Sequence, residues 1–107
     1  MRNYTNEKFL RHKEDKIKKL ISNGEKFFIE TFDSLHYLYS LENRLYNTPT
    51  LSVFEAVYIN NLKLPAWKLA NILCLSRTTL FNYRNKIVKN FETYLEKEMA
   101  LTKGYKL

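Results

Sequence analysis

The sequence has very little of what most folds use for turns, cross-links or membrane spans. Its 107 residues include two glycines, two prolines and one cysteine. An all-β sandwich needs many turn signals and is therefore not expected, and a single cysteine excludes an intrachain disulfide. No run approaches the roughly 18 apolar residues of a membrane span. The first twenty residues contain no apolar core of signal-peptide length, so we expect a cytoplasmic protein.

Residue clusters typical of catalytic or metal sites are missing as well. His12 and His36 fall on different predicted helices, and with one cysteine no metal-ligand spacing is recognisable. Cys74 has no His or Cys near it in sequence that would activate its thiol. No glycine-rich loop that could cradle a phosphate is present. We expect no catalytic residue, no metal, no cofactor and no enzyme activity.

What remains is typical of one small all-α protein. Hydrophobic residues make up 45% of the chain, and apolar residues recur at helical spacing over 6–21 and 25–46. Gly24 is expected to end the first helix, and a capping box of Ser52 and Glu55 to begin a third one that reaches about residue 62. Pro65 suits the start of a fourth helix. Ser76 is the expected N-cap of a last helix that meets no breaker before Gly104.

These helices suggest two regions that together form one compact unit. Residues 1–47 are expected to be N-terminal helices for oligomerisation or partner contact. Residues 48–107 are expected to be a helix-turn-helix region, with a long last helix and a helical tail.

Charge is distributed unevenly between the segments of this basic chain, whose net charge is +7. Residues 1–20 carry seven Lys/Arg and three Asp/Glu, residues 21–62 carry two and five, and residues 63–107 carry nine and three. No carboxylate occurs from residue 56 to residue 91. The C-terminal segment is therefore the natural place for an anionic partner, because Lys and Arg that neutralise phosphates release counterions.

The stretch 65–87, "PAWKLANILCLSRTTLFNYRNKI", has the pattern of two helices crossing over a short turn. The side chains expected to face inward are Leu69, Ala70, Leu73, Leu75, Leu80, Tyr83 and Ile87. Those expected on the opposite face of the second helix are Arg77, Thr78, Phe81, Asn82 and Asn85. Trp67 is expected either to brace the first of these helices against DNA or to pack on the last helix, and we favour packing. Cys74 occupies the usual glycine position of the turn, so a positive φ and mild strain are expected there.

The outward set has the chemistry of DNA base recognition. Arg bonds two acceptors of guanine, Asn does the same with adenine, and Thr and Phe contact the thymine methyl group. The side chains expected at phosphates are Lys68, Ser76, Arg84, Lys86 and Lys89. The alternative interpretation is a solvated surface helix without a ligand, since helix-turn-helix patterns also occur as purely structural corners.

The segment "LKLPAWKLANILCLSRTTLFNYRNKIVKNF" resembles the helix-turn-helix of sigma-factor region 4. It is most similar to ArpU-type late-gene regulators of Gram-positive phages, through Tyr58-Ile59, Ser76, Thr79, Tyr83-Arg84 and Lys86. The resemblance covers about residues 51–95. It implies a sequence-specific double-stranded DNA binder that regulates transcription for a phage or mobile element, with residues 76–86 facing the DNA. We expect the recognition helix in the major groove to span about residues 76–90.

Further partners and rival functions follow from the remaining surface. One module makes few base contacts, so RNA polymerase or a second copy, bound through residues 25–46 or 90–101, is an expected partner. A DNA-packaging protein similar to a small terminase subunit is one rival function. The other is a protein-binding inhibitor module that uses the helix-turn-helix as a structural corner.

Overall fold

The computed structural model describes the backbone of residues 7–103 and the side chains of residues 7–97. Within that range the protein is all-α, as predicted, and contains no strand. Its elements are α1 (Glu7–Ser22), α2 (Lys26–Tyr46), α3 (Thr50–Phe54), the π-helical turn η1 (Glu55–Ile59), α4 (Ala66–Ile72) and α5 (Arg77–Lys103). The expected regions 1–47 and 48–107 extend beyond the described residues at the outer ends.

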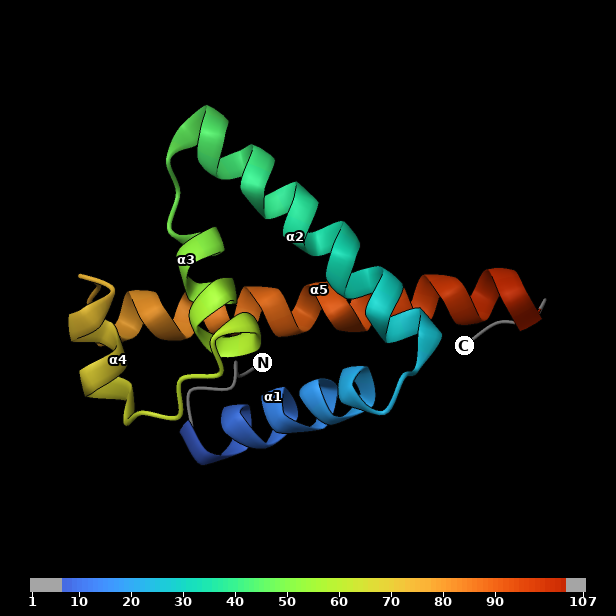
Figure 1. Ribbon diagram of the computed structural model, residues 1–107, viewed down its shortest axis with the longest axis horizontal. Coiled ribbons are helices and arrows are strands. Elements are labelled where there is room, and N and C mark those ends of the chain that lie inside the picture. The colour runs from blue at the N-terminus through green and yellow to red at the C-terminus, as the bar shows by residue number, and fades with distance from the viewer. Residues whose placement is uncertain (1–6, 104–107) are drawn as a thin grey trace.

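Helix α5 is the axis of the arrangement (Figure 1). It runs the length of the molecule, α1 lies along one side of it, and α2 descends diagonally across its second half. Helix α4 lies across the start of α5. None of these helices is long and apolar enough to cross a membrane.

The turn between α1 and α2 forms where the sequence predicts it. Gly24 has φ of +83°, and its amide bonds the Ile21 carbonyl at 3.1 Å while the Glu25 amide bonds the Leu20 carbonyl at 3.1 Å. This pair of bonds is a Schellman motif, which requires a left-handed residue and therefore favours glycine.

The third helix differs from the predicted one at both ends. It begins at Thr50 with Pro49 as N-cap and no side-chain cap bond, so the expected capping box of Ser52 and Glu55 is wrong. Proline lacks an amide hydrogen and suits this position, where the first amides have no helical partner. The helix then widens into η1, which ends at Ile59 rather than near residue 62.

One hydrophobic core joins all of these elements. The residues at its centre with almost no exposed surface are Leu10, Leu35, Tyr39, Val53, Phe54, Leu69, Leu80, Ile87, Val88 and Phe91. A chain of rings crosses it, with centroid distances of 5.2 Å for Phe32–Phe54, 5.4 Å for Phe54–Tyr58 and 5.5 Å for Tyr58–Phe91. In α1 the buried apolar residues are Leu10 and Ile17, whereas Phe9 is 57% exposed.

Candidate nucleic-acid interface

Helices α4 and α5 are joined by residues 73–76, and the turn has well-defined backbone geometry. Cys74 has φ of +59°, the positive value expected for a glycine position. Its amide bonds the Asn71 carbonyl at 3.1 Å, and the Leu75 amide bonds the Ala70 carbonyl at 2.9 Å, which completes a second Schellman motif. Cys74, which is exposed, therefore adopts a left-handed backbone that ends α4, and this conformation is strained for a residue other than glycine.

The start of α5 is capped as the sequence predicts. The Ser76 hydroxyl oxygen accepts the Thr79 amide hydrogen at 3.1 Å, and the same hydroxyl donates to Thr79 Oγ1 at 2.9 Å. The Ser76 carbonyl accepts from the Leu80 amide at 2.9 Å. A serine cap satisfies one of the free amides at the helix start, and it fixes where the exposed face of α5 begins.

The expected inward face is largely present. Leu69, Ala70, Leu80 and Ile87 are buried. Leu73, Leu75 and Tyr83 are partly buried and pack against the same core. Because both helices bury one stripe against a shared core, the α4–α5 pair is held as one body, and the core fixes the backbone from which its outer side chains project.

Three of the five expected base-reading residues are exposed together at the start of α5. Arg77, Thr78 and Asn82 all face solvent. Phe81 is only partly exposed and packs against the core, with the Arg84 guanidinium carbon 5.5 Å from its ring centre. The exposed recognition face is thus shorter than the sequence pattern suggests.

Asn85 was expected to read bases, and this prediction is wrong. Its residue surface is 5% exposed, and its side-chain amide donates to the Phe81 carbonyl at 2.8 Å. Helical spacing alone places Asn85 beside Asn82, but it carries no information about neighbouring elements. The fold covers this side of α5, so a base edge cannot reach Asn85.

Arg84 was expected at a DNA phosphate, and this prediction is also wrong. The residue is 1% exposed. Its Nε and one terminal nitrogen donate to the two carboxylate oxygens of Glu14, at 2.9 and 2.7 Å. The other terminal nitrogen donates to Glu7 Oε1 at 2.7 Å. Both carboxylates come from α1, so the guanidinium of Arg84 pairs with α1 inside the protein and is not available to DNA.

The electrostatics of this cluster agree with its geometry. Burial by itself would lower the pKa of Arg84, but the hydrogen bonds and charges of Glu14 and Glu7 outweigh burial and raise that pKa. Burial would likewise raise the pKa of Glu7, and Arg84 and Arg11 together lower it. Arg84 and Glu7 are therefore charged over the physiological range, and the ion pairs of Arg84 with Glu14 and Glu7 hold α1 against α5.

The expected phosphate-binding lysines divide into two groups. Lys68 on α4 and Lys89 on α5 are exposed. Lys86 instead turns toward α2, where its Nζ lies 3.4 Å from Glu42 Oε2 and 3.4 Å from Thr50 Oγ1. The Lys86 side chain is still 42% exposed, and ion pairs at the protein surface are weak, so its assignment to a phosphate stays a prediction.

The outer face of α4 contains more exposed side chains than Lys68, the one that the sequence predicts there. Trp67 was expected to pack on the last helix, but it is 55% exposed, and Ile72 is 54% exposed. Asn71 is exposed beside them, as is Lys63 just before the helix. Helical spacing could have revealed this face, since positions 67, 68, 71 and 72 lie opposite the buried positions 66, 69 and 70.

A scan against protein-family models and searches of curated proteins and of solved structures find no match for this chain. The surface has to be interpreted from its own chemistry. Its exposed side chains combine amide, hydroxyl, guanidinium and ammonium groups with two apolar side chains, and no carboxylate belongs to the segment from residue 56 to residue 91.

Proposed function

We propose that this chain is a sequence-specific double-stranded DNA-binding protein that regulates transcription in the cytoplasm, for a phage or mobile element. In this proposal α4 and α5 are a helix-turn-helix, and the first turns of α5 enter the major groove. The observation that carries it is the capped, acid-free start of α5, where Arg77, Thr78 and Asn82 are exposed together. The regulatory role and the phage origin rest on the resemblance to ArpU-type regulators.

Each exposed side chain at the start of α5 suits one kind of base edge. Arg77 can donate twice to guanine, Asn82 can pair its amide with adenine, and the Thr78 methyl group can contact thymine. Each good base contact contributes about 1–3 kcal/mol of discrimination against a wrong base. Three such residues support a short recognition element rather than a long one.

Phosphate contacts can come from both helices. Lys68 on α4 and Lys89 on α5 supply cations, and the start of α5 supplies amides together with the positive end of a long helix dipole. Trp67 and Ile72 give α4 an apolar outer surface that can rest against the sugar backbone. Such contacts position a protein on the duplex without reading its sequence.

The decisive experiment is selection of bound sequences from a random duplex DNA pool. The full chain should enrich a short consensus. The double variant Arg77→Ala with Asn82→Ala should lose that consensus while it keeps weak, salt-sensitive binding. Failure of the unmodified chain to enrich any sequence at low salt contradicts the proposal.

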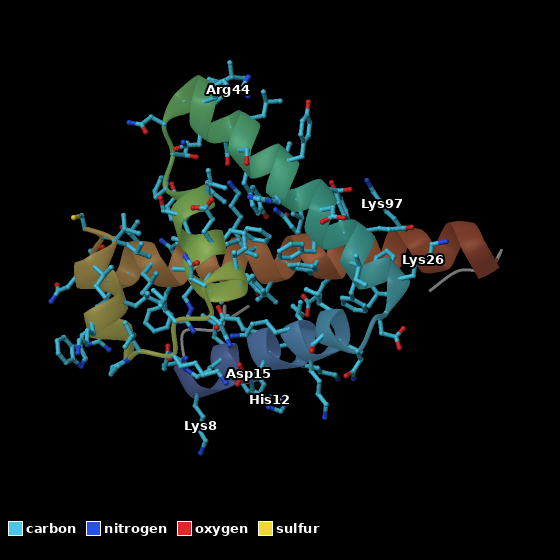
Figure 2. All side chains as sticks on the ribbon, viewed as in Figure 1. Lys8, His12, Asp15, Lys26, Arg44 and Lys97 are labelled. Atoms are coloured by element: carbon cyan, nitrogen blue, oxygen red, sulfur yellow. The ribbon has the colours of Figure 1, made fainter. Side chains whose placement is uncertain are left out.

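A matched control removes the same chemistry from another surface. Lys26→Ala with Asn23→Ala also deletes one cation and one amide, and Lys26 lies at the opposite end of the molecule from α4 (Figure 2). This control should retain the consensus in full. If both double variants lose the consensus alike, net charge rather than the α5 face controls binding.

The rival functions predict other outcomes. A protein similar to a small terminase subunit would form a stable ring of many copies in light scattering. An inhibitor module would keep its activity after Arg77→Ala with Asn82→Ala, because the pair would then act only as a corner of the fold. We favour DNA regulation because the exposed chemistry is concentrated at the start of α5.

A further inference from the structure

Helix α4 is short and needs support from outside itself. It has seven residues, and helices of this length are unstable in isolation. Its C-terminal end is joined to α5 by the turn at residues 73–76, and three of its residues are buried in the core. Its N-terminal end follows residues 61–65, which have no regular secondary structure. The direction of α4 relative to α5 therefore depends on what holds this N-terminal end.

A side chain of α1 holds it. The Arg11 Nη2 donates to the Leu64 carbonyl at 2.8 Å, and the N-terminal end of α1 lies beside the segment that leads into α4 (Figure 1). This carbonyl belongs to the planar peptide bond between Leu64 and Pro65. Pro65 is the N-cap of α4 with φ of −57°, an angle that the proline ring restricts. A bond to the Leu64 carbonyl therefore restricts the direction in which α4 begins.

Glu7 connects Arg11 to α5. Its Oε2 accepts from Arg11 Nε at 2.8 Å, and its Oε1 accepts from Arg84 at 2.7 Å. Glu7 and Arg11 are four residues apart on α1, so they lie on one face of that helix. A continuous set of hydrogen bonds thus runs from Arg84 on α5 through α1 to Leu64 at the start of α4. Hydrogen bonds of charged groups are about twice as strong as those between neutral groups.

We propose that Arg11 is a positioning residue, which sets the angle of α4 relative to α5. The turn at residues 73–76 fixes one end of α4, and the bonds of Arg11 fix the other. Trp67 and Lys68 lie in the first turn of α4, at the end away from the 73–76 turn, so release of Leu64 displaces them most. The consequence for DNA rests on the proposed function: Arg11 tightens binding without touching DNA, because it holds Lys68 at a phosphate.

The partners of Arg11 favour this role over a phosphate contact of its own. Its Nε and Nη2 donate within the protein, to Glu7 and to Leu64, and only 30% of its side chain is exposed. Lys68, in contrast, is exposed on α4. The guanidinium of Arg11 therefore holds the backbone, and the ammonium of Lys68 is the cation whose position it sets.

Hydrogen exchange of single amides tests this role without DNA. The Lys68 and Leu69 amides both donate to the Pro65 carbonyl at 3.0 Å, next to the carbonyl that Arg11 bonds. Arg11→Met keeps the apolar part of the side chain and removes its hydrogen bonds. Exchange at Leu69 should become at least about tenfold faster relative to exchange at Val88, since a hydrogen bond to a charged group contributes about that factor. Val88 is buried in α5, so the ratio separates a local change from a loss of global stability.

The matched control is Lys18→Met on the same helix. Lys18 also donates to the segment before α4, but its bond, at 2.8 Å, ends on the side chain of Asn61 rather than on the backbone next to the helix. This variant should leave the ratio of Leu69 to Val88 exchange unchanged. Glu7→Gln is a second and milder variant, because it keeps the size of the side chain and removes its charge. It should shift the ratio in the same direction as Arg11→Met, by a smaller factor.

A double-mutant cycle with Lys68 connects this role to DNA binding. Arg11→Met should weaken binding of the selected consensus in the unmodified chain and have little further effect in a Lys68→Ala background, because both substitutions then remove the same contact. An Arg11 that contacted a phosphate itself would give additive losses instead.

Each measurement has an outcome that contradicts the inference. Unchanged exchange at Leu69 in Arg11→Met overturns it, as does an equal change in Lys18→Met. Additive losses of binding, or a Lys68→Ala variant that binds as tightly as the unmodified chain, overturn its consequence for DNA. If exchange at Leu69 responds while no DNA consensus is enriched, the DNA-binding proposal alone has failed.

Discussion

The buried cluster of Arg84, Glu14 and Glu7 yields the sharpest prediction. From the sequence, Arg84 was predicted to contact a DNA phosphate, whereas in the fold it pairs with two carboxylates of α1. Arg84→Met removes the guanidinium and keeps most of the apolar volume. Glu14, at 2% exposure, then becomes a buried carboxylate without its two donors at 2.9 and 2.7 Å. The variant should be destabilised through this carboxylate, whatever the chain binds.

The magnitude follows from the burial of both partners. Breaking a buried ion pair on one side costs about 3–5 kcal/mol, out of roughly 5–15 kcal/mol for a whole domain. At about 4–8 °C for each kcal/mol in a chain of this size, Tm should fall by more than about 12 °C. Removing both charges with Arg84→Met and Glu14→Met should return stability to within about 2 kcal/mol of the unmodified chain, since apolar replacements of buried pairs are often neutral.

The assay is urea unfolding followed by far-ultraviolet circular dichroism on the unmodified chain, both single variants and the double variant. The coupling between the two substitutions isolates the ion pair. A stability of Arg84→Met within about 1 kcal/mol of the unmodified chain would refute the reasoning, because it would mean that Arg84 is not paired inside the protein.

Binding measurements supply an independent readout of the same question. On the proposed DNA function, the double variant should keep the salt dependence of the unmodified chain, because Arg84 contacts no phosphate. Lys89→Ala should flatten that slope by about one. The reverse result would restore the assignment of Arg84 to DNA.

Three further predictions concern the turn, the cap and high pH. Cys74→Gly relieves a left-handed backbone at φ +59° and should raise the unfolding free energy by up to about 1 kcal/mol in urea melts, net of the greater chain entropy of glycine; a loss of stability would show that residue 74 is not strained. Ser76→Ala should cost about 1 kcal/mol in the same assay; Ser76→Asp should keep the cap yet weaken DNA retention, and equal retention by both variants would contradict a phosphate near Ser76. Burial raises the pKa of Tyr39 to about 12, although the bond from Asn90 opposes it, and burial raises the pKa of Tyr58 well above 10. Unfolded tyrosines ionise near pH 10, so stability should fall as pH rises from about 10 to 12, and Tyr58→Phe should reduce that fall in pH-dependent melts; an unchanged alkaline profile would contradict it.

The sequence by itself determined the helices and most of their ends. Gly24, Pro65 and Ser76 act through backbone chemistry that needs only their immediate neighbours, and each lies at a helix end of the expected kind. The positive φ of Cys74 was predictable for the same reason, because ending α4 at this point requires a left-handed residue. The predicted Ser52 cap is wrong because Pro49 provides a competing N-cap three residues earlier.

Only the tertiary structure decided which polar side chains of α5 are free. Helical spacing places Arg77, Thr78, Asn82 and Asn85 on one face, yet it contains no information about what lies against that face. The Arg84 guanidinium donates to Glu7 and Glu14, which precede it by 77 and 70 positions. Lys86 contacts Glu42, which precedes it by 44 positions. Such pairings depend on how α1 and α2 pack against α5, so no local pattern could have revealed them.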